Sequence, residues 1–141
     1  MMINTMKTAM IIASDAGART AGIIREELGK EVDLFSVSER SGCVRIDSIT
    51  DFTLRHFGDY EAFVFIGAMG ICVRAIAPCV TSKYADPAVV NVDATGHFVV
   101  SVLAGHVGGA NALTERLARI LGAQPVVTTQ SDNTGLWALD L

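Results

Sequence analysis

The sequence predicts an α/β domain with three layers: a mostly parallel sheet, helices on both of its faces, and one antiparallel hairpin. Two observations predict this class. Short apolar runs alternate along the chain with segments of helical periodicity. These runs are apolar at consecutive positions, which is typical of strands that helices cover on both faces.

We expect six strands. They are predicted at residues 7–13, 32–37, 62–66, 88–92, 98–103 and 125–128. The third (AFVFI) gives the strongest signal, because it is rich in β-branched and aromatic residues. Only residues 93–97 separate the fourth strand from the fifth, which is too short for a parallel crossover. Residues 88–103 should therefore form the antiparallel hairpin.

Four helices are expected between the strands. The first covers residues 20–28 and ends at Gly29, since glycine takes a left-handed conformation without penalty. The second follows a capping-box pattern at residues 48–51 and stops at Gly58. The third covers residues 69–77 and is ended by Pro78.

The fourth helix has the clearest pattern. One apolar stripe is formed by Leu113, Leu117, Ile120 and Leu121, and Gly122 ends the helix. We expect residues 1–135 to form a single α/β domain. Residues 136–141 should begin a linker or a following domain, so that the chain would be a truncated piece.

Composition excludes several classes of protein. The chain has 141 residues, 50% of them hydrophobic, and a formal charge of −4. Such a chain can bury enough surface to fold, and its acidity argues against binding to nucleic acid. No apolar run is long enough to span a membrane, and no signal peptide is visible. Three cysteines without a CxxC spacing predict a reducing, cytoplasmic location.

Candidate ligand contacts follow three of the predicted strands. Ligands of open α/β sheets bind beyond the carboxyl ends of the strands. Small residues stand there in this sequence: Gly67 and Gly70 after the third strand, Gly105, Gly108, Gly109 and Asn111 after the fifth, Thr128 and Thr129 after the sixth. We expect these segments to converge on one pocket that accepts negative charge.

The segment 105–111 carries the most chemistry. It leads from a strand into a helix, whose first N–H groups favour an anion or a developing oxyanion. It matches no nucleotide-binding motif, and the alternative is a tight turn with close helix packing. His106 could act as general base or acid, or could only hydrogen-bond its own loop.

Two cations are further candidates. Arg74 is the sole charge on an apolar helix, so its guanidinium should reach solvent, a carboxylate or an anionic ligand. Lys83 lies in a loop that could either contact a ligand or be merely solvated. No histidine or cysteine spacing predicts a protein-bound metal.

Five segments in this order resemble the N-terminal domain of the CbiG family of cobalamin biosynthesis. They are residues 70–78 (GICVRAIAP), 83–90 (KYADPAVV), 93–96 (DATG), 103–111 (LAGHVGGAN) and 125–129 (PVVTT). The resemblance spans about residues 60–133. It implies the cobalt-precorrin-5A hydrolase reaction of the anaerobic route to vitamin B12. In that reaction the δ-lactone of a macrocycle opens and a two-carbon unit leaves as acetaldehyde, giving cobalt-precorrin-5B.

The resemblance suggests roles for the candidate residues. His106, or Asp132, would activate water. Backbone N–H groups near Gly108 and Gly109 would stabilise the oxyanion, one such donor being worth ~3 kcal/mol. Arg74 and Lys83 would bind substrate carboxylates. The other binding residues would be Gly67, Gly70, Gly105, Asn111, Thr128 and Thr129.

Cobalt would be carried within the substrate, and no other cofactor is expected. The expected partners are the cobalt-corrinoid substrate and the remaining domains of the parent protein, with neither nucleic acid nor membrane, and association with a second copy of the chain stays open. Two alternatives stay open. The domain could bind a corrinoid without catalysing a reaction, or it could bind a small phosphorylated ligand at residues 105–111.

Overall fold

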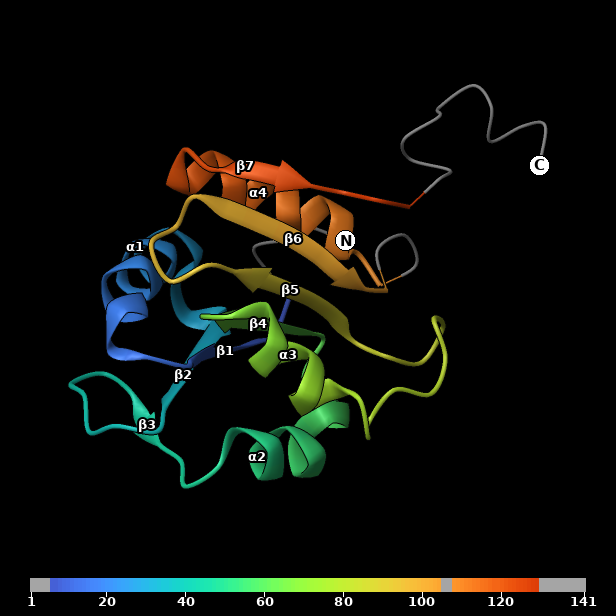
Figure 1. The fold of residues 1–141 in the computed structure, drawn as a ribbon, viewed down its shortest axis with the longest axis horizontal. Helices are drawn as coiled ribbons and strands as arrows, with labels where there is room; N and C mark the ends of the chain where they lie inside the picture. The colour runs from blue at the N-terminus through green and yellow to red at the C-terminus, as the bar shows by residue number, and fades with distance from the viewer. Residues whose placement is uncertain (1–5, 105–107, 130–141) are drawn as a thin grey trace.

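The computed structural model describes residues 6–104 and 108–129, and they form one mixed sheet with helices on both faces (Figure 1). The strand order is β3-β2-β1-β4-β5-β6-β7. The strands are β1 (Thr8–Ile12), β2 (Val32–Ser36), β3 (Val44–Arg45), β4 (Ala62–Ile66), β5 (Ala88–Val92), β6 (Phe98–Leu103) and β7 (Gln124–Val126). The predicted fold class is confirmed, although β3 has only two residues and was not predicted.

The helices form the two outer layers. They are α1 (Ala18–Leu28), α2 (Ile49–His56), α3 (Met69–Ile76) and α4 (Ala110–Leu121), and three short 3₁₀ turns cover Asp15–Gly17, Gly29–Glu31 and Phe57–Asp59. The side chains of α1 and α4 share one hydrophobic core, and those of α2 and α3 share the other. All four predicted helices are present.

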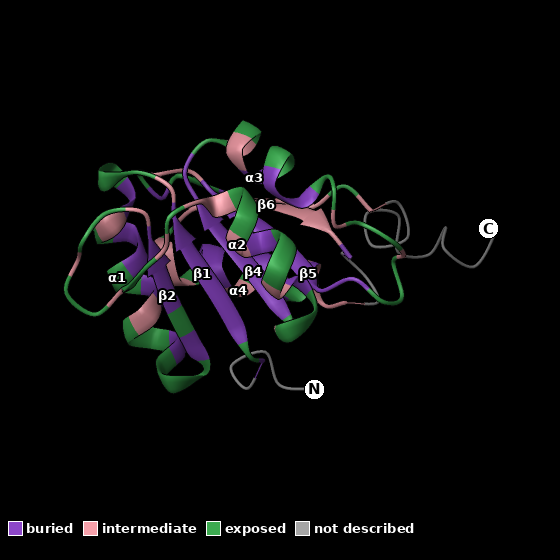
Figure 2. Ribbon diagram, turned by 90° about the horizontal axis from the view of Figure 1, so that it is seen from below, coloured by how far each residue is buried: buried purple, intermediate pink, exposed green. Residues whose placement is uncertain are grey.

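Consecutive residues of the central strands point into different cores. Met10, Val64 and Val90 lie in the core beneath α1 and α4, whereas Phe63 and Val89 lie in the core beneath α2 and α3. Strands β1, β4 and β5 are buried along their whole length (Figure 2). This is why these strands read as continuous apolar runs rather than as alternating ones.

The pair β5–β6 is the antiparallel hairpin, and every other pair of neighbouring strands is parallel. Strands β6 and β7 therefore run opposite to β1, β2, β4 and β5, as the arrowheads in Figure 1 show. The carboxyl ends of the strands therefore lie at two opposite ends of the sheet, and the word edge is used for such a row of strand ends rather than for an outermost strand. We call the edge where β1, β2, β4 and β5 end the α3 edge, because α3 begins there. The edge where β6 and β7 end is the α4 edge, because α4 begins there.

Candidate functional site

The end of β6 and the start of α4 are joined by hydrogen bonds at the α4 edge. The N–H groups of Gly108 and Ala110 both donate to the carbonyl oxygen of Ala104, at 3.1 and 3.2 Å. Ala104 has a φ of 56°, which is uncommon outside glycine, and Gly109 has a φ of 88°. A Cβ on Gly108 would lie only 2.6 Å from the Cβ of Ala104 and 2.9 Å from its oxygen. The turn can close in this way only because residue 108 is glycine.

This closure corrects one prediction about the oxyanion donors. The Gly108 N–H does not point to a ligand, since it is used within the turn to bind the Ala104 carbonyl. Gly108 instead serves close packing, which the sequence had left as the alternative. The Ala110 N–H, at the first position of α4, is used within the turn in the same way, so Gly109 at the N-cap is the candidate donor at this edge.

Asn111 ties the start of α4 to both neighbouring strands. The Ser101 hydroxyl in β6 donates to Asn111 Oδ1 at 2.7 Å, and Asn111 Nδ2 donates to Thr129 Oγ1 at 2.6 Å. Thr129 follows β7, so three separate segments of the chain meet at this amide. Thr128, beside it, is exposed. The structure therefore brings Gly109, Asn111, Thr128 and Thr129 to one edge.

The loop that carries Lys83 reaches the same edge. This loop leads into β5 at Ala88, whose nitrogen lies 3.5 Å from the position of a Cβ on Gly108. Lys83 is exposed, and its Nζ lies 5.3 Å from the centre of the Tyr84 ring. Among the described residues its ammonium group makes no ion pair.

A buried carboxylate holds this loop in place. Both oxygens of Asp86 accept the Thr81 N–H, at 3.1 and 3.0 Å, and they also accept the Thr81 hydroxyl and the Ser82 N–H. The sequence analysis missed Asp86 and Ser101. No Asx-turn pattern identifies Asp86, because it accepts from residues four and five positions earlier, whereas the acceptor of an Asx-turn bonds to the backbone two residues further on. Nothing local distinguishes Ser101 from other strand serines.

The prediction of one shared pocket is wrong. Gly67 and Gly70 lie at the α3 edge, and the described residues of the 105–111 segment lie at the α4 edge. The cause is the reversal of the chain between β5 and β6, which sends the carboxyl ends of β6 and β7 to the opposite edge. A Cβ on Gly67 would lie 2.7 Å from the Cβ of Ala13, so this glycine permits close packing of the loops after β1 and β4.

Arg74 also belongs to the α3 side of the molecule. Its guanidinium lies beside Gly70, where Nη1 is 3.4 Å from the position of a Cβ, and the residue is exposed. In the part of the chain that the structure describes, the Arg74 head group forms no ion pair. Its role in binding a carboxylate stays a prediction. Gly105, His106 and Asp132 lie outside the described residues, and their roles stay predictions as well.

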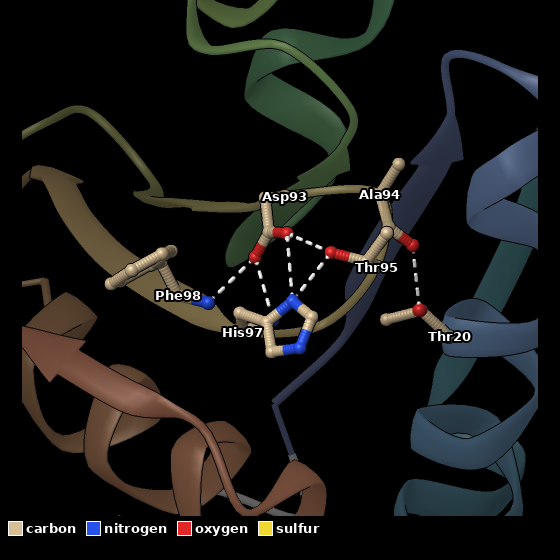
Figure 3. A network of polar contacts seen from close by, with 6 residues as sticks. All are labelled: Thr20, Asp93, Ala94, Thr95, His97 and Phe98. Atoms are coloured by element: carbon tan, nitrogen blue, oxygen red, sulfur yellow. Dashed lines mark hydrogen bonds and ion pairs between the residues drawn. The ribbon is translucent and has the colours of Figure 1, made fainter.

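The hairpin turn at residues 93–97 causes the reversal, and a carboxylate holds it closed (Figure 3). Asp93 Oδ1 accepts the N–H groups of His97 and Phe98 at 2.8 and 2.6 Å, and Oδ2 accepts the Thr95 hydroxyl at 2.6 Å. Thr20 in α1 donates to the Ala94 carbonyl at 2.7 Å, which anchors the turn on the helix layer. Burial alone would raise the pKa of Asp93, but these hydrogen bonds outweigh burial and lower the pKa.

Neither the Cys72 thiol nor any group of possible metal ligands adds a site within the described residues. Cys72 is fully buried, and burial raises the pKa of its thiol to about 12, so it is uncharged at neutral pH. No group of three His, Cys, Asp or Glu side chains among residues 6–104 and 108–129 is arranged to hold a metal ion. Within the same ranges, no helix has both the length and the apolar character needed to cross a membrane.

Comparison with known proteins gives one consistent result. The family described as "Cobalamin synthesis G N-terminal" matches residues 51–132. A cobalt-precorrin-5A hydrolase from Salmonella typhimurium is 56% identical over 84 residues, which is 60% of this chain and 24% of that protein. A protein of the same name from Priestia megaterium is 50% identical over 76 residues, 54% of this chain and 20% of that protein. The chain thus spans about a quarter or less of the length of these relatives.

A solved structure is similar in fold. It is the crystal structure of a cobalamin biosynthesis protein G homolog from Sulfolobus solfataricus. The TM-score is 0.71 at 26% sequence identity, over 89% of this chain and 38% of that one. The family match includes the whole α4 edge: the loop with Lys83, the turn before α4 and the residues after β7.

Proposed function

The chain belongs to the cobalamin synthesis G N-terminal family. From this premise we propose that it is the N-terminal domain of a cobalt-precorrin-5A hydrolase. The reaction would be hydrolytic opening of the δ-lactone of cobalt-precorrin-5A, followed by release of acetaldehyde to give cobalt-precorrin-5B. The observation that carries the proposal is the identity of 56% with a hydrolase of that name. Cobalt would enter as part of the substrate.

We place the reacting lactone at the α4 edge. Lactone hydrolysis develops negative charge on the carbonyl oxygen, and the Gly109 N–H at the N-cap of α4 is suited to stabilise it. The hydrogen bonds of Asn111 to Ser101 and Thr129 fix the start of the helix on β6 and β7. Donors held in this way need no rearrangement when the charge appears, and this is the source of their catalytic effect.

Substrate carboxylates would bind to Lys83 at the same edge. The substrate carries several acetate and propionate groups. The exposed Lys83 ammonium has no ion-pair partner among the described residues and can donate hydrogen bonds to one of these carboxylates. The Asp86 hydrogen bonds hold the loop, so Lys83 is presented from an ordered backbone. His106 would take the proton of the attacking water, and Asp132 would be the second candidate for that role.

The test compares two histidines in the full-length protein. His106→Ala should lower lactone opening and acetaldehyde release by about a hundredfold or more, since a general base contributes at least that much. His97→Ala is the control, because His97 is exposed in the hairpin turn at the α3 edge. Unchanged turnover in His106→Ala, or an equal loss in both variants, would show that His106 is not the base.

A second candidate function is corrinoid binding without catalysis. It is favoured by the fact that the chain spans only about a quarter of the length of the relatives. In that case the chain alone should be stabilised against heat by a corrinoid, by ~2.7 kcal/mol at a hundredfold excess over Kd, and should release no acetaldehyde. Stabilisation by inorganic phosphate instead would favour a phosphorylated ligand at the start of α4.

We place the protein in the cytoplasm. Cys43, Cys72 and Cys79 are all free thiols, as expected in a reducing compartment. Extraction from the parent organism under thiol-blocking conditions should find all three cysteines reduced, and an oxidised fraction would contradict this location.

A further inference from the structure

A cavity of about 350 Å³ lies between α1 and the loop of residues 37–43, which joins β2 to β3. Its floor is apolar and includes Ile12, the last residue of β1, and Leu34 in β2. Both side chains belong to the core beneath α1 and α4. The volume lies within the range of about 300–1,000 Å³ that is typical of small-molecule pockets, and open α/β sheets bind ligands near the carboxyl ends of their strands. We call this space the α1 cavity.

Two arginines hold the loop beside α1. Arg25 in α1 donates from Nη1 to the carbonyl oxygen of Gly42 at 2.9 Å. Arg40 in the loop forms an ion pair with Asp15, which lies in the 3₁₀ turn that precedes α1. The loop is therefore attached to the helix side of the cavity at two points, so the α1 cavity is bounded by elements that contact each other in the folded chain.

The wall that α1 contributes to the cavity contains a glycine that packing does not require. Gly22 lies inside α1, where glycine is less stable than alanine because it loses more conformational freedom on folding. Outside the neighbouring backbone of α1, no atom of the described residues lies within 4 Å of the position of a Cβ on Gly22. Close approach of a ligand to the backbone is an ordinary reason for a glycine, and it accounts for a residue that the protein's own packing leaves unexplained.

The charged groups around the α1 cavity balance one another. Glu39 and Arg40 both line it. Asp15 and Arg25, which bind the loop from the helix side, add one charge of each sign. This balance is unfavourable for a ligand that carries several charges of one sign, such as a macrocycle with many carboxylates. It suits a molecule without net charge that carries one group of each sign.

Arg40 has donor capacity for a ligand carboxylate. Its Nε is buried and has no hydrogen-bond partner among the described residues, and an unpaired buried donor destabilises a protein. Its partner Asp15 has a side chain that is 84% exposed, and ion pairs so close to solvent contribute little to stability. A ligand carboxylate can therefore replace Asp15 at the guanidinium and accept from Nε and Nη2 together, in the two-bond geometry that arginine favours.

We propose that the α1 cavity binds an α-amino acid with an apolar side chain. The carboxylate of the amino acid binds Arg40, and its ammonium group binds Glu39. Its side chain packs on Ile12 and Leu34, in the space beside Gly22. Binding at this site does not depend on the proposed hydrolase activity, because none of these residues lies at the α4 edge.

Titration of the isotope-labelled 141-residue chain with L-leucine and L-methionine, followed by nuclear magnetic resonance, tests the proposal. Both amino acids should shift the amide signals of Gly22, Ser41 and Cys43, which line the cavity. Two probes keep the leucine side chain but lack one charged group: isovalerate lacks the ammonium group, and isoamylamine lacks the carboxylate. Each should bind about tenfold more weakly than L-leucine, because it loses charge-assisted hydrogen bonds at one residue.

Variants separate the three contacts. Gly22→Leu should abolish binding of L-leucine by filling the cavity, and the fold should be kept because leucine is a better helix former than glycine. Glu27→Leu is the matched control, because it adds the same side chain at an exposed position of α1 that does not line the cavity. Arg40→Gln should weaken binding of L-leucine and isovalerate but not of isoamylamine. Glu39→Gln should weaken binding of L-leucine and isoamylamine but not of isovalerate.

The proposal fails if neither amino acid shifts the signals of the lining residues at millimolar concentration. It also fails if isovalerate or isoamylamine binds as tightly as L-leucine, because the cavity would then recognise a single charge. Binding that survives Gly22→Leu in a protein still folded by circular dichroism would place the amino acid elsewhere. An equal loss of binding in Gly22→Leu and Glu27→Leu would refute the proposal as well, because the effect would then not come from filling the cavity.

Discussion

Replacing Gly108 with alanine should open the turn before α4. The new Cβ would lie 2.6 Å from the Ala104 Cβ, 2.9 Å from the Ala104 oxygen and 3.5 Å from the Ala88 nitrogen. Two of these three atoms belong to the backbone, and the third is the Cβ of an alanine, which has no rotamer to change. The turn can therefore relieve the clash only by moving its backbone away from β5 and β6.

The magnitude follows from what that movement would break. The N–H groups of Gly108 and Ala110 share the Ala104 carbonyl, and weakening these two bonds costs about 1 kcal/mol each. An added methyl in a packed site costs about 1–3 kcal/mol of strain. We therefore expect the free energy of unfolding to fall by about 3–5 kcal/mol. For a domain of this size that corresponds to a drop in Tm of about 10–20 °C.

Two other glycines separate packing from backbone effects. Gly22 lies inside α1 with nothing within 4 Å of a Cβ, so Gly22→Ala should raise stability by about 0.5–1 kcal/mol. Gly122 has a φ of 66° and equally open space. Gly122→Ala should therefore cost only the left-handed conformation, about 1–2 kcal/mol.

Urea and thermal unfolding of the wild type and the three variants give the measurement. The expected order of stability is Gly22→Ala above the wild type, then Gly122→Ala, then Gly108→Ala. The reasoning would be refuted if Gly108→Ala were as stable as the wild type, because the clash could then be absorbed without breaking the turn. A changed urea m-value in Gly108→Ala alone would indicate loss of two-state unfolding rather than a simple loss of stability.

Three other predictions concern carboxylates and cations. Asp93→Asn should cost about 1 kcal/mol at pH 7, because charge-assisted bonds in the hairpin turn are weakened. The native pKa of Asp93 is lowered, so its contribution is present above the unfolded pKa of about 4 and is lost progressively as pH falls below it. The gap to the wild type in urea unfolding should therefore narrow below about pH 4, and a gap that stays constant as pH falls further would contradict this. Asp86→Ala should lower the free energy of unfolding by about 3 kcal/mol and speed hydrogen exchange at the Thr81 and Ser82 amides, and Asp86→Asn should cost less. Slow exchange at these amides in Asp86→Ala would show that other contacts hold the loop. Lys83→Ala should raise the KM of the full-length enzyme more than Arg74→Ala, and the reverse order would move the carboxylate site to the α3 edge.

Local patterns were sufficient to predict the elements of the fold. Strands β1, β4 and β5 are apolar at consecutive positions because each strand contributes side chains to both hydrophobic cores. The stripe of α4 and its stop at Gly122 follow from residues only a few positions apart. The short link at residues 93–97 was enough to predict an antiparallel hairpin. Strand β3, with two residues, is too short to produce any such pattern.

The tertiary structure decided which candidate residues meet. Gly67 and Gly109 both follow a strand and both precede a helix, so their local sequences look equivalent. They lie at different edges because β6, which leads to Gly109, is antiparallel to β5, whereas β4, which leads to Gly67, is parallel to β1 and β5. The same holds for Asn111, whose partners Ser101 and Thr129 are 10 and 18 residues away.

What the sequence alone determined is therefore the described helices α1 to α4, the described strands other than β3, the family resemblance and the residue types suited to bind an anion. What only the tertiary structure decided is their grouping into two edges and the use of the Gly108 N–H inside its own turn. The physical reason is the separation along the chain of the residues that interact. Periodicity and turn chemistry act between residues close in the chain, whereas hydrogen bonds between strands and the space for a single Cβ depend on segments that meet only when the sheet is assembled.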